Sequence, residues 1–357
     1  MGAARITERE RPNHVASPLT PLPLMELATS FWAYKTFAAA VELDLFTHLS
    51  HAGPATAAEI GVELGLPERP ALLLTAACAG LGLLEKADAE RYRNAPLAEA
   101  FLVAGKPYWF GGFVRFCDVR EYPAWGRVVE ALRSDRPLTW TPAPGVGLFD
   151  AEDPQMMGLF WQAMHSLSSF SAREFAAACD LSRCRALLDV GGGSGAWPIE
   201  LTKVNPGMRA AVLDLPHVCE IAAERIAEAG MSDRISTIPG DFLAGEPLPR
   251  GYDAILLSMI LHDWDEGVGR RLLADCFEAL EPSGAVIVCE LLLDDDRSGP
   301  ASAALMGMNM LVETEGGQNY TGAQYADWLV SAGFEPPQVV PLETAGANAA
   351  LIATRPG

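Results

Sequence analysis

His262 and Asp263 stand side by side directly after an apolar run, in the stretch AILLSMILHDWDE at 254–266. The run has the length and composition of a buried β-strand, so both side chains should emerge where that strand ends. A neutral imidazole within hydrogen-bond reach of a hydroxyl group can act as a general base. The alternative is a polar loop in which His262 only caps the helix that follows.

Glu290 closes the next apolar strand, AVIVCE. In an open α/β sheet the carboxyl ends of parallel strands meet at one edge, where ligands bind, so Glu290 and His262 should lie close together. A carboxylate on the second ring nitrogen of a histidine fixes the tautomer and stabilises the imidazolium. Glu290 is therefore predicted either to orient the base or to be a buried structural partner.

A glycine loop follows the first strand of this region, in ALLDVGGGSGAW at 186–197. A strand, glycines and then a helix let backbone amides approach a ligand closely. Gly191, Gly193 and Ala196 fit the dinucleotide pattern G-x-G-x-x-G/A, and they fit the G-x-G-x-G pattern of S-adenosylmethionine (SAM) sites equally well. A tight turn without a ligand is the third interpretation.

Three later residues separate these interpretations. Asp214 ends the second strand and would bond ribose hydroxyl groups in either kind of site. Asp241 and Phe242 follow the third strand, where they could bond the adenine amino group and cover the ring. No Arg follows Asp214 to hold a 2′-phosphate, and the loop lies in the second half of the chain. These features favour SAM over a dinucleotide.

A metal site is not predicted. Adjacent His and Asp residues can begin a metal-binding triad, but His262 is the last histidine of the chain. Only Glu290 and Glu313 remain as further ligands, and they would give a weak, acid-rich set.

Composition excludes several classes of protein. The formal net charge of −20 repels nucleic-acid phosphates and anionic lipids, so a partner of either kind is not expected. The longest apolar stretch that could be considered as a membrane-spanning segment, residues 71–84, is too short to span a bilayer. The seven cysteines form no CxxC pair, which indicates reduced thiols. No signal peptide is visible, and a soluble, cytoplasmic protein is expected.

The 357 residues suit two domains and two further segments. Residues 1–20 are expected to be a disordered tail, and 21–105 a winged-helix domain. Residues 106–182 would form a helical linker and a lid over the substrate. Strands alternate with helices over 183–357, which predicts a parallel α/β sheet closed by an antiparallel hairpin.

The winged helix is not expected to bind DNA. Thr56 should cap a short helix, a second helix should follow over 68–81, and LGLLEKADAERYRNAP resembles a small β wing. Arg69 is the only basic residue of the second helix, which therefore cannot hold phosphate groups. Packing or dimerisation is predicted for this domain.

Taken in order and spacing, LLDVGGGSG, LDLPHV, GDF, ILHDWDE, VIVCELLL and MNMLVETEGG resemble the caffeate-type SAM-dependent O-methyltransferases. The resemblance covers nearly the whole chain, because the winged helix looks like the dimerisation domain of that family. It implies a class I SAM-methyltransferase fold with a Rossmann-like sheet, SAM as cofactor and a homodimer formed through the N-terminal domain.

The resemblance also implies a set of site residues. Cofactor contacts would come from Gly191, Gly193, Asp214, Leu215, Asp241, Phe242, Ser258 and Ser168. Substrate contacts would come from Met164, Phe160, Trp161, Met308, Asn309 and Asn319. His262 would be the catalytic base, with Glu290 and Asp263 as its acidic partners.

The chain departs from the family pattern at two positions. Ser258 stands where plant members carry a Lys, so the SAM contacts there must differ. Asn319, in GGQNYT, replaces a second catalytic Glu and cannot carry its charge. Because a deprotonated phenol is also electron-rich at its ortho carbon, this replacement leaves both O- and C-methylation open.

The leading hypothesis is a SAM-dependent methyltransferase that acts on a small phenolic natural-product intermediate, with oxygen as the favoured methyl acceptor. The first alternative is C-methylation of an aromatic amino acid or its keto acid. More distant alternatives are a non-methylating enzyme on the SAM fold and a winged-helix protein that senses a small ligand. The acceptor molecule is left open.

Overall fold

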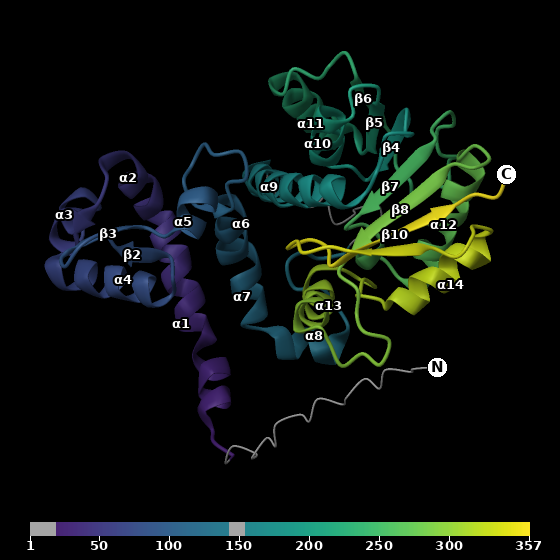
Figure 1. The fold of residues 1–357 in the computed structure, drawn as a ribbon. Coiled ribbons are helices and arrows are strands. Elements are labelled where there is room, and N and C mark those ends of the chain that lie inside the picture. Colours follow the sequence, from purple (N-terminus) through teal and green to yellow (C-terminus); the bar gives the residue numbers. More distant parts are fainter. Residues whose placement is uncertain (1–18, 143–153) are drawn as a thin grey trace, which may run out of the picture.

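The computed structural model describes residues 19–142 and 154–357 (Figure 1). Most of the predicted tail, residues 1–18, lies outside the described residues, as does 143–153. A helical N-terminal part stands beside a large sheet flanked by helices, and the long helix α9 (Pro154–Ala178) runs from one to the other. Among the described helices, none combines the length and apolar character that a membrane crossing requires.

The N-terminal part has the predicted winged-helix arrangement. Thr56 caps α3 in a capping box with Glu59, which satisfies backbone N–H groups that the first turn leaves free. The predicted wing is confirmed as an antiparallel pair of strands, and a short third strand completes the sheet in the order β1-β3-β2. Its elements are α1 (Leu22–Glu42), α2 (Leu45–Ala52), β1 (Ala55–Thr56), α3 (Ala57–Glu63), α4 (Glu68–Gly80), β2 (Leu84–Lys86), β3 (Arg91–Asn94) and α5 (Pro96–Phe101).

Short helices join this part to the sheet domain, and one of them is a π-helix. The segment η1 (Cys117–Glu121) has i→i+5 geometry, which is rare and is found mostly at functional sites. It lies between α6 (Gly111–Phe116) and α7 (Tyr122–Trp125), and α8 (Val128–Ser134) follows.

The C-terminal part is an α/β unit around a seven-stranded sheet of order β6-β5-β4-β7-β8-β10-β9. The first five strands of this unit pair in parallel, and the predicted antiparallel closing hairpin is confirmed by the pairing of β10 with β8 and β9. The strands are β4 (Ala186–Val190), β5 (Arg209–Asp214), β6 (Ile235–Pro239), β7 (Ala254–Ser258), β8 (Ala285–Glu290), β9 (Gln338–Pro341) and β10 (Ala349–Thr354). The helices are α10 (Ala196–Val204), α11 (Pro216–Glu228), the 3₁₀ turn η2 (Leu261–Asp263), α12 (Glu266–Ala279), α13 (Ala301–Glu313) and α14 (Gly322–Ala332).

Both faces of the sheet are buried under helices. Successive residues of a strand point to opposite faces, so neighbours in one strand join different cores. Leu188 joins the core beneath α12 and α14, whereas its neighbour Leu187 joins the core beneath α9 and α10. Trp328 and Phe175 are large, fully buried anchors of these two cores. The sheet is therefore a rigid platform for the loops at its carboxyl edge.

The strand order reverses next to β4, since β5 lies on one side and β7 on the other. At such a switch point the two following loops diverge and leave a crevice in which α/β proteins bind ligands. The loop after β4 is the glycine loop, and the turn after β7 carries His262. The topology thus places the two predicted motifs beside one crevice.

The apolar run that leads to His262 is only partly strand. β7 ends at Ser258, because Met259 adopts a left-handed backbone conformation with φ of 55°. This conformation is costly for a residue with a side chain and is characteristic of functional sites. The chain then turns into η2, which holds His262 and Asp263.

Candidate active site

A cavity of about 620 Å³ opens at the carboxyl edge of the sheet. Its size falls in the range of ligand-binding sites in proteins. The glycine loop and the ends of β5 and β7 line one side, and η1, α9 and α13 line the other. His262 and Asp263 line the same cavity.

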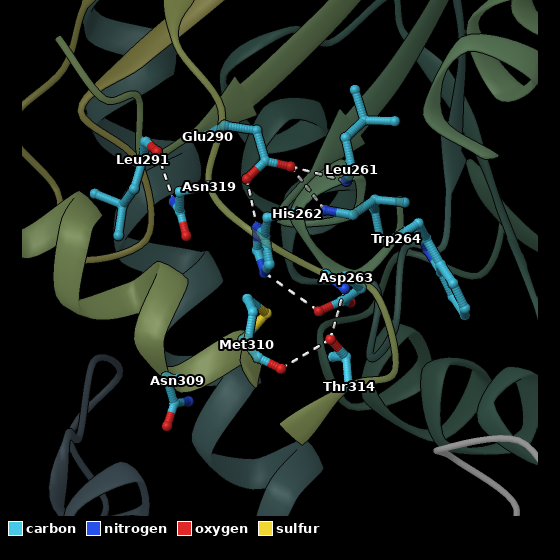
Figure 2. Close-up of polar contacts among 12 residues, drawn as sticks. Leu261, His262, Asp263, Trp264, Glu290, Leu291, Asn309, Met310, Thr314 and Asn319 are labelled. Carbon is cyan, nitrogen blue, oxygen red and sulfur yellow. Dashed lines mark hydrogen bonds and ion pairs between the residues drawn. The ribbon is translucent and has the colours of Figure 1, made fainter. Parts of the chain in front are cut away.

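His262 stands between two carboxylates (Figure 2). Its Nδ1 lies 2.5 Å from Oε2 of Glu290, and its Nε2 lies 3.4 Å from Oδ1 of Asp263. Glu290 is fully buried behind the ring, whereas Asp263 reaches the cavity. The predicted proximity of His262 and Glu290 is confirmed.

Glu290 also fixes the turn that carries the histidine. Its Oε1 accepts hydrogen bonds from the backbone N–H groups of Ile260 at 3.0 Å and Leu261 at 2.9 Å. One buried carboxylate therefore holds both the backbone before the imidazole and the imidazole itself. Because β8 pairs directly with β7, the end of β8 delivers this carboxylate beneath the turn.

The two acids change the protonation of the imidazole. Burial by itself lowers the pKa of His262, but Glu290 and Asp263 stabilise the imidazolium and raise that pKa to about 9. Burial raises the pKa of Asp263 to about 6, against the attraction of His262. The ring is thus a stronger base than an ordinary histidine.

Gly317 lets a second loop pack against the histidine turn. A Cβ atom at this position would lie 2.5 Å from the carbonyl oxygen of His262 and 2.5 Å from Oγ1 of Thr314. Neither contact is compatible with a side chain. The backbone N–H of Gly317 donates to Oγ1 of Thr314 at 2.8 Å, which ties this loop to the end of α13.

The glycine loop is held open towards the cavity by backbone geometry. Gly191, Gly193 and Gly195 all have positive φ, in the region that glycine adopts without strain. The N–H of Gly193 donates to Oδ2 of Asp214 at 2.8 Å, and the N–H of Leu215 donates to Oδ1 at 2.7 Å. Asp214 therefore shapes the loop and lines the cavity at the same time.

Asp189 is a cavity residue that was not singled out from the sequence. It is 1% exposed and lies two positions before Gly191, and its Oδ2 has no hydrogen-bond partner among the residues that the structure describes. Burial raises the pKa of this carboxyl group well above its usual range, and the charge of Asp214 acts in the same direction. In the sequence, an acid within the apolar strand ALLDV, one residue before its end, was the feature that could have indicated this site.

The other predicted cofactor residues also line the cavity. Asp241 and Phe242 follow β6, and the ring of Phe242 meets that of Trp264 edge to face at 6.2 Å. Ser258 lies at the end of β7, and Ser168 lies on α9. The structure therefore brings together the eight residues that the resemblance assigned to SAM.

The predicted substrate residues are divided. Phe160, Trp161 and Met164 of α9 line the cavity, as does Asn309 of α13. Met308 does not belong to the lining, because the residues of α13 that face the cavity follow helical spacing. They are Ser302, Leu305, Met306, Asn309, Met310 and Glu313.

Asn319 does not line the cavity either. It is 2% exposed and lies beside Glu290 and His262 (Figure 2), where its Nδ2 donates to the carbonyl oxygen of Leu291 at 2.6 Å. Within 19–142 and 154–357, its Oδ1 finds no hydrogen-bond partner. The predicted contact between Asn319 and a substrate is thus not present in this arrangement of the chain.

Polar residues of η1 bond directly to residues of α13 in the cavity wall, and these contacts were not predicted from the sequence. Arg120 forms a buried ion pair with Glu313, and Nδ2 of Asn309 donates to Oε1 of Glu121 at 3.1 Å. Burial raises the pKa of Glu313 to about 7, against the charge of Arg120. These partners are far apart in the chain, so no local pattern could have paired them.

Across 19–142 and 154–357, no group of three His, Cys, Asp or Glu side chains could hold a metal ion.

A family model described as the O-methyltransferase domain matches residues 125–335, and one described as the O-methyltransferase dimerisation domain matches residues 25–104. The chain belongs to the O-methyltransferase family. It is a SAM-dependent methyltransferase, with a C-terminal Rossmann-like sheet and an N-terminal helical dimerisation domain.

Several relatives of this chain are named for aromatic acceptors. It is 49% identical to the 3-hydroxy-5-methyl-1-naphthoate 3-O-methyltransferase of Streptomyces sahachiroi, over 92% of this chain and 93% of the relative. It is 33% identical to the L-tyrosine C(3)-methyltransferase of Streptomyces lavendulae, over 85% of this chain and 84% of that one. The crystal structure of human N-acetylserotonin methyltransferase in complex with SAM superposes with a TM-score of 0.84 at 30% identity, covering 96% of this chain and 99% of the human one.

The residues of the crevice fit SAM. A cofactor with a cationic sulfonium and an ammonium group suits a cavity wall that carries Asp189, Asp214 and Asp241. The carboxylate group of SAM is suited to the start of α10, where Gly195 supplies no side-chain cap to the free N–H groups. The unpartnered Oδ2 of Asp189 is consistent with a ligand that completes its hydrogen bonding.

The pKa of His262 can be measured directly by NMR titration of its ring signals from about pH 5 to 10. We expect a value near 9 in the ligand-free enzyme. Glu290→Gln removes a charge that stabilises the imidazolium, so the pKa should fall; Asp263→Asn should lower it as well. Surface variant Asp327→Asn, which removes a carboxylate remote from the ring, is the control. An unchanged His262 pKa in both active-site variants would contradict this electrostatic account.

Substitution of Gly317 tests the packing of the second loop. Gly317→Ala should cost roughly 1–3 kcal/mol of unfolding free energy, because the methyl group forces the loop away from the His262 turn. Turnover should fall with it. The matched control is Gly316→Ala, since a Cβ atom there would meet Asp265 at an ordinary distance of 3.4 Å. Thermal unfolding of both variants gives the comparison, and equal stabilities would contradict the packing argument.

Proposed function

We propose that this O-methyltransferase methylates a ring hydroxyl group of a small aromatic natural-product intermediate, with His262 as the general base. One observation carries the proposal: His262 lines the cavity while buried Glu290 holds its Nδ1 at 2.5 Å. In the neutral ring, Nε2, which faces Oδ1 of Asp263 at 3.4 Å, is then the nitrogen that takes the proton of an acceptor. Because the pKa of the ring is about 9, the population of this neutral form grows as the pH rises towards that value. The family membership supports oxygen as the acceptor atom.

The chemistry needs such a base. SAM supplies an electrophilic methyl group when bound. A phenol with a pKa of about 10 is a poor nucleophile at neutral pH, and a positioned base that removes its proton raises its reactivity. The carboxylates of Glu290 and Asp263 stabilise the imidazolium that forms. Because methyl transfer requires in-line alignment, the walls of the cavity supply the remaining catalysis by orienting the acceptor and excluding water.

For the acceptor we propose a flat, hydroxylated aromatic acid of the naphthoate type. The 49% identity to the naphthoate 3-O-methyltransferase supports this choice. The cavity wall contributed by α6 and α9 suits a planar ring system, because Phe113, Phe116, Phe160 and Trp161 line it. Met164 is proposed to complete that wall and Asn309 to bond a polar substituent.

We assign the cofactor contacts to the residues that line the crevice. Asp214 and Leu215 are placed at the ribose and Asp241 and Phe242 at the adenine, as the family pattern implies. Gly191, Gly193, Ser168 and Asp189 are assigned to the methionine part of SAM. Ser258 is assigned to the cofactor as well, by neutral contacts in place of the Lys of plant members.

C-methylation is the second candidate. The similarity to the L-tyrosine C(3)-methyltransferase and the replacement of the second catalytic Glu by Asn319 support it. The burial of Asn319 behind the base weakens it, because that amide does not reach an acceptor. A deprotonated phenol is the same intermediate state in both reactions, so His262 would serve either.

We further propose a homodimer formed through residues 21–105 and a cytoplasmic location with reduced cysteines. The family match to a dimerisation domain supports the dimer. Helix α1 exposes a group of large apolar side chains, which a monomer would leave in contact with water. They are Leu22, Leu24, Met25, Leu27, Phe31 and Trp32.

Removal of the base tests the reaction. His262→Ala should lower turnover at least about a hundredfold, whereas its SAM affinity, measured by calorimetry, should stay near that of the wild type. NMR of the product made with ¹³C-methyl SAM and a hydroxynaphthoate separates a methoxyl from a C-methyl group. Turnover that survives the substitution would exclude His262 as the base, and a C-methyl signal would favour the second candidate.

A charge on α1 tests the dimer. Leu27→Glu places a carboxylate in the exposed apolar group and should yield monomers in light scattering after size exclusion. Val204→Glu introduces the same charge at an exposed apolar residue of α10, outside the dimerisation domain, and should leave the assembly unchanged. A Leu27→Glu protein that remains dimeric would place the interface elsewhere.

A further inference from the structure

Helix α9 contacts the glycine loop at two successive turns. The ring of Trp161 lies directly against Gly193, where a Cβ atom would meet its Cζ3 at 2.7 Å. One turn later, Nδ1 of His165 lies 2.8 Å from Oγ of Ser194, within hydrogen-bond distance. The helix that walls the acceptor side of the cavity therefore also holds the loop assigned to the methyl donor.

The loop needs such a restraint. Ser194 lies between Gly193 and Gly195, and both glycines have positive φ. Glycine restricts the backbone least, so a loop of this composition loses more conformational entropy on ordering than other sequences. Residues 191–195 are four glycines and Ser194, so Ser194 alone among them has a side chain that can form a hydrogen bond. This side chain is buried and lines the cavity.

His165 is suited to a neutral, fixed contact. Burial lowers the pKa of His165 to about 4, and the charges of Arg225 and Lys203 act in the same direction, opposed by Glu228. The ring is therefore uncharged at neutral pH, with one donor and one acceptor nitrogen. Nδ1 can bond the Ser194 hydroxyl in either tautomer. The proposed methyl transfer does not use this imidazole.

We propose that His165 is a positioning residue for the methyl donor. By bonding the hydroxyl of Ser194, it ties α9 to the glycine loop and sets the backbone against which SAM binds. The inference rests on the assignment of this loop to SAM. It predicts that SAM affinity depends on Nδ1 of His165, although this side chain is not itself assigned to the cofactor.

Two amide substitutions separate this role from simple packing. The side-chain amide of His165→Asn lies near the position of Nδ1 and can bond Ser194, whereas that of His165→Gln lies near the position of Nε2. Calorimetry with SAM and with S-adenosylhomocysteine should give a Kd within about twofold of wild type for Asn and about fivefold weaker for Gln. Gln is the better helix former, so weaker binding by Gln cannot arise from loss of α9 stability.

Ser194→Ala removes the other partner and should weaken SAM binding by a similar factor. Combined with His165→Gln it should add little, because both substitutions remove the same hydrogen bond. Thermal unfolding without ligand shows whether each variant is folded before its affinity is compared.

Equal affinities of the Asn and Gln variants, or full additivity with Ser194→Ala, would overturn the inference. Asp214→Asn distinguishes this failure from a failure of the cofactor assignment. It should weaken SAM binding whatever His165 does, because Asp214 both lines the cavity and bonds Gly193. An unchanged Kd in Asp214→Asn would overturn the assignment of the site and this inference with it.

Discussion

The hydrogen bond between buried Glu290 and His262 is the constraint on which the site depends. A carboxylate without solvent contact is costly unless all its oxygens are engaged, and here one oxygen holds the imidazole while the other receives two backbone N–H groups. The same group that makes the ring more basic therefore fixes the backbone that presents it. Orientation and basicity cannot be separated in this arrangement.

The sheet explains how these groups meet. β7 and β8 are parallel neighbours, so the turn after one and the last residue of the other emerge at the same edge. β4 lies on the other side of β7 and delivers the glycine loop to that edge. The positive φ of Met259 and the missing side chain at Gly317 allow the His262 turn to be compressed between the strand end and the loop after α13. Close packing, rather than a long loop, holds His262.

Much of this arrangement could be predicted from the sequence. The capping residue Thr56, the wing and the closing hairpin were readable because caps, turns and strand periodicity are local signals. The meeting of His262 with Glu290 was also predictable, because both follow apolar strands and parallel strands end at a common edge. Short-range pattern combined with one topological rule was sufficient there.

Contacts between segments far apart in the chain required the tertiary structure. The pairing of Arg120 with Glu313 depends on the π-helical register of η1 and on how η1 packs against α13. Neither can be predicted from the local sequence pattern. Helical phase likewise directed Asn309 to the cavity and left Met308 out of its lining, and packing buried Asn319 away from the cavity. The sequence by itself determined which chemical groups leave the sheet and at which edge, because strand periodicity is local. Only the tertiary structure decided which groups line the wall opposite, because that depends on how separate helices pack.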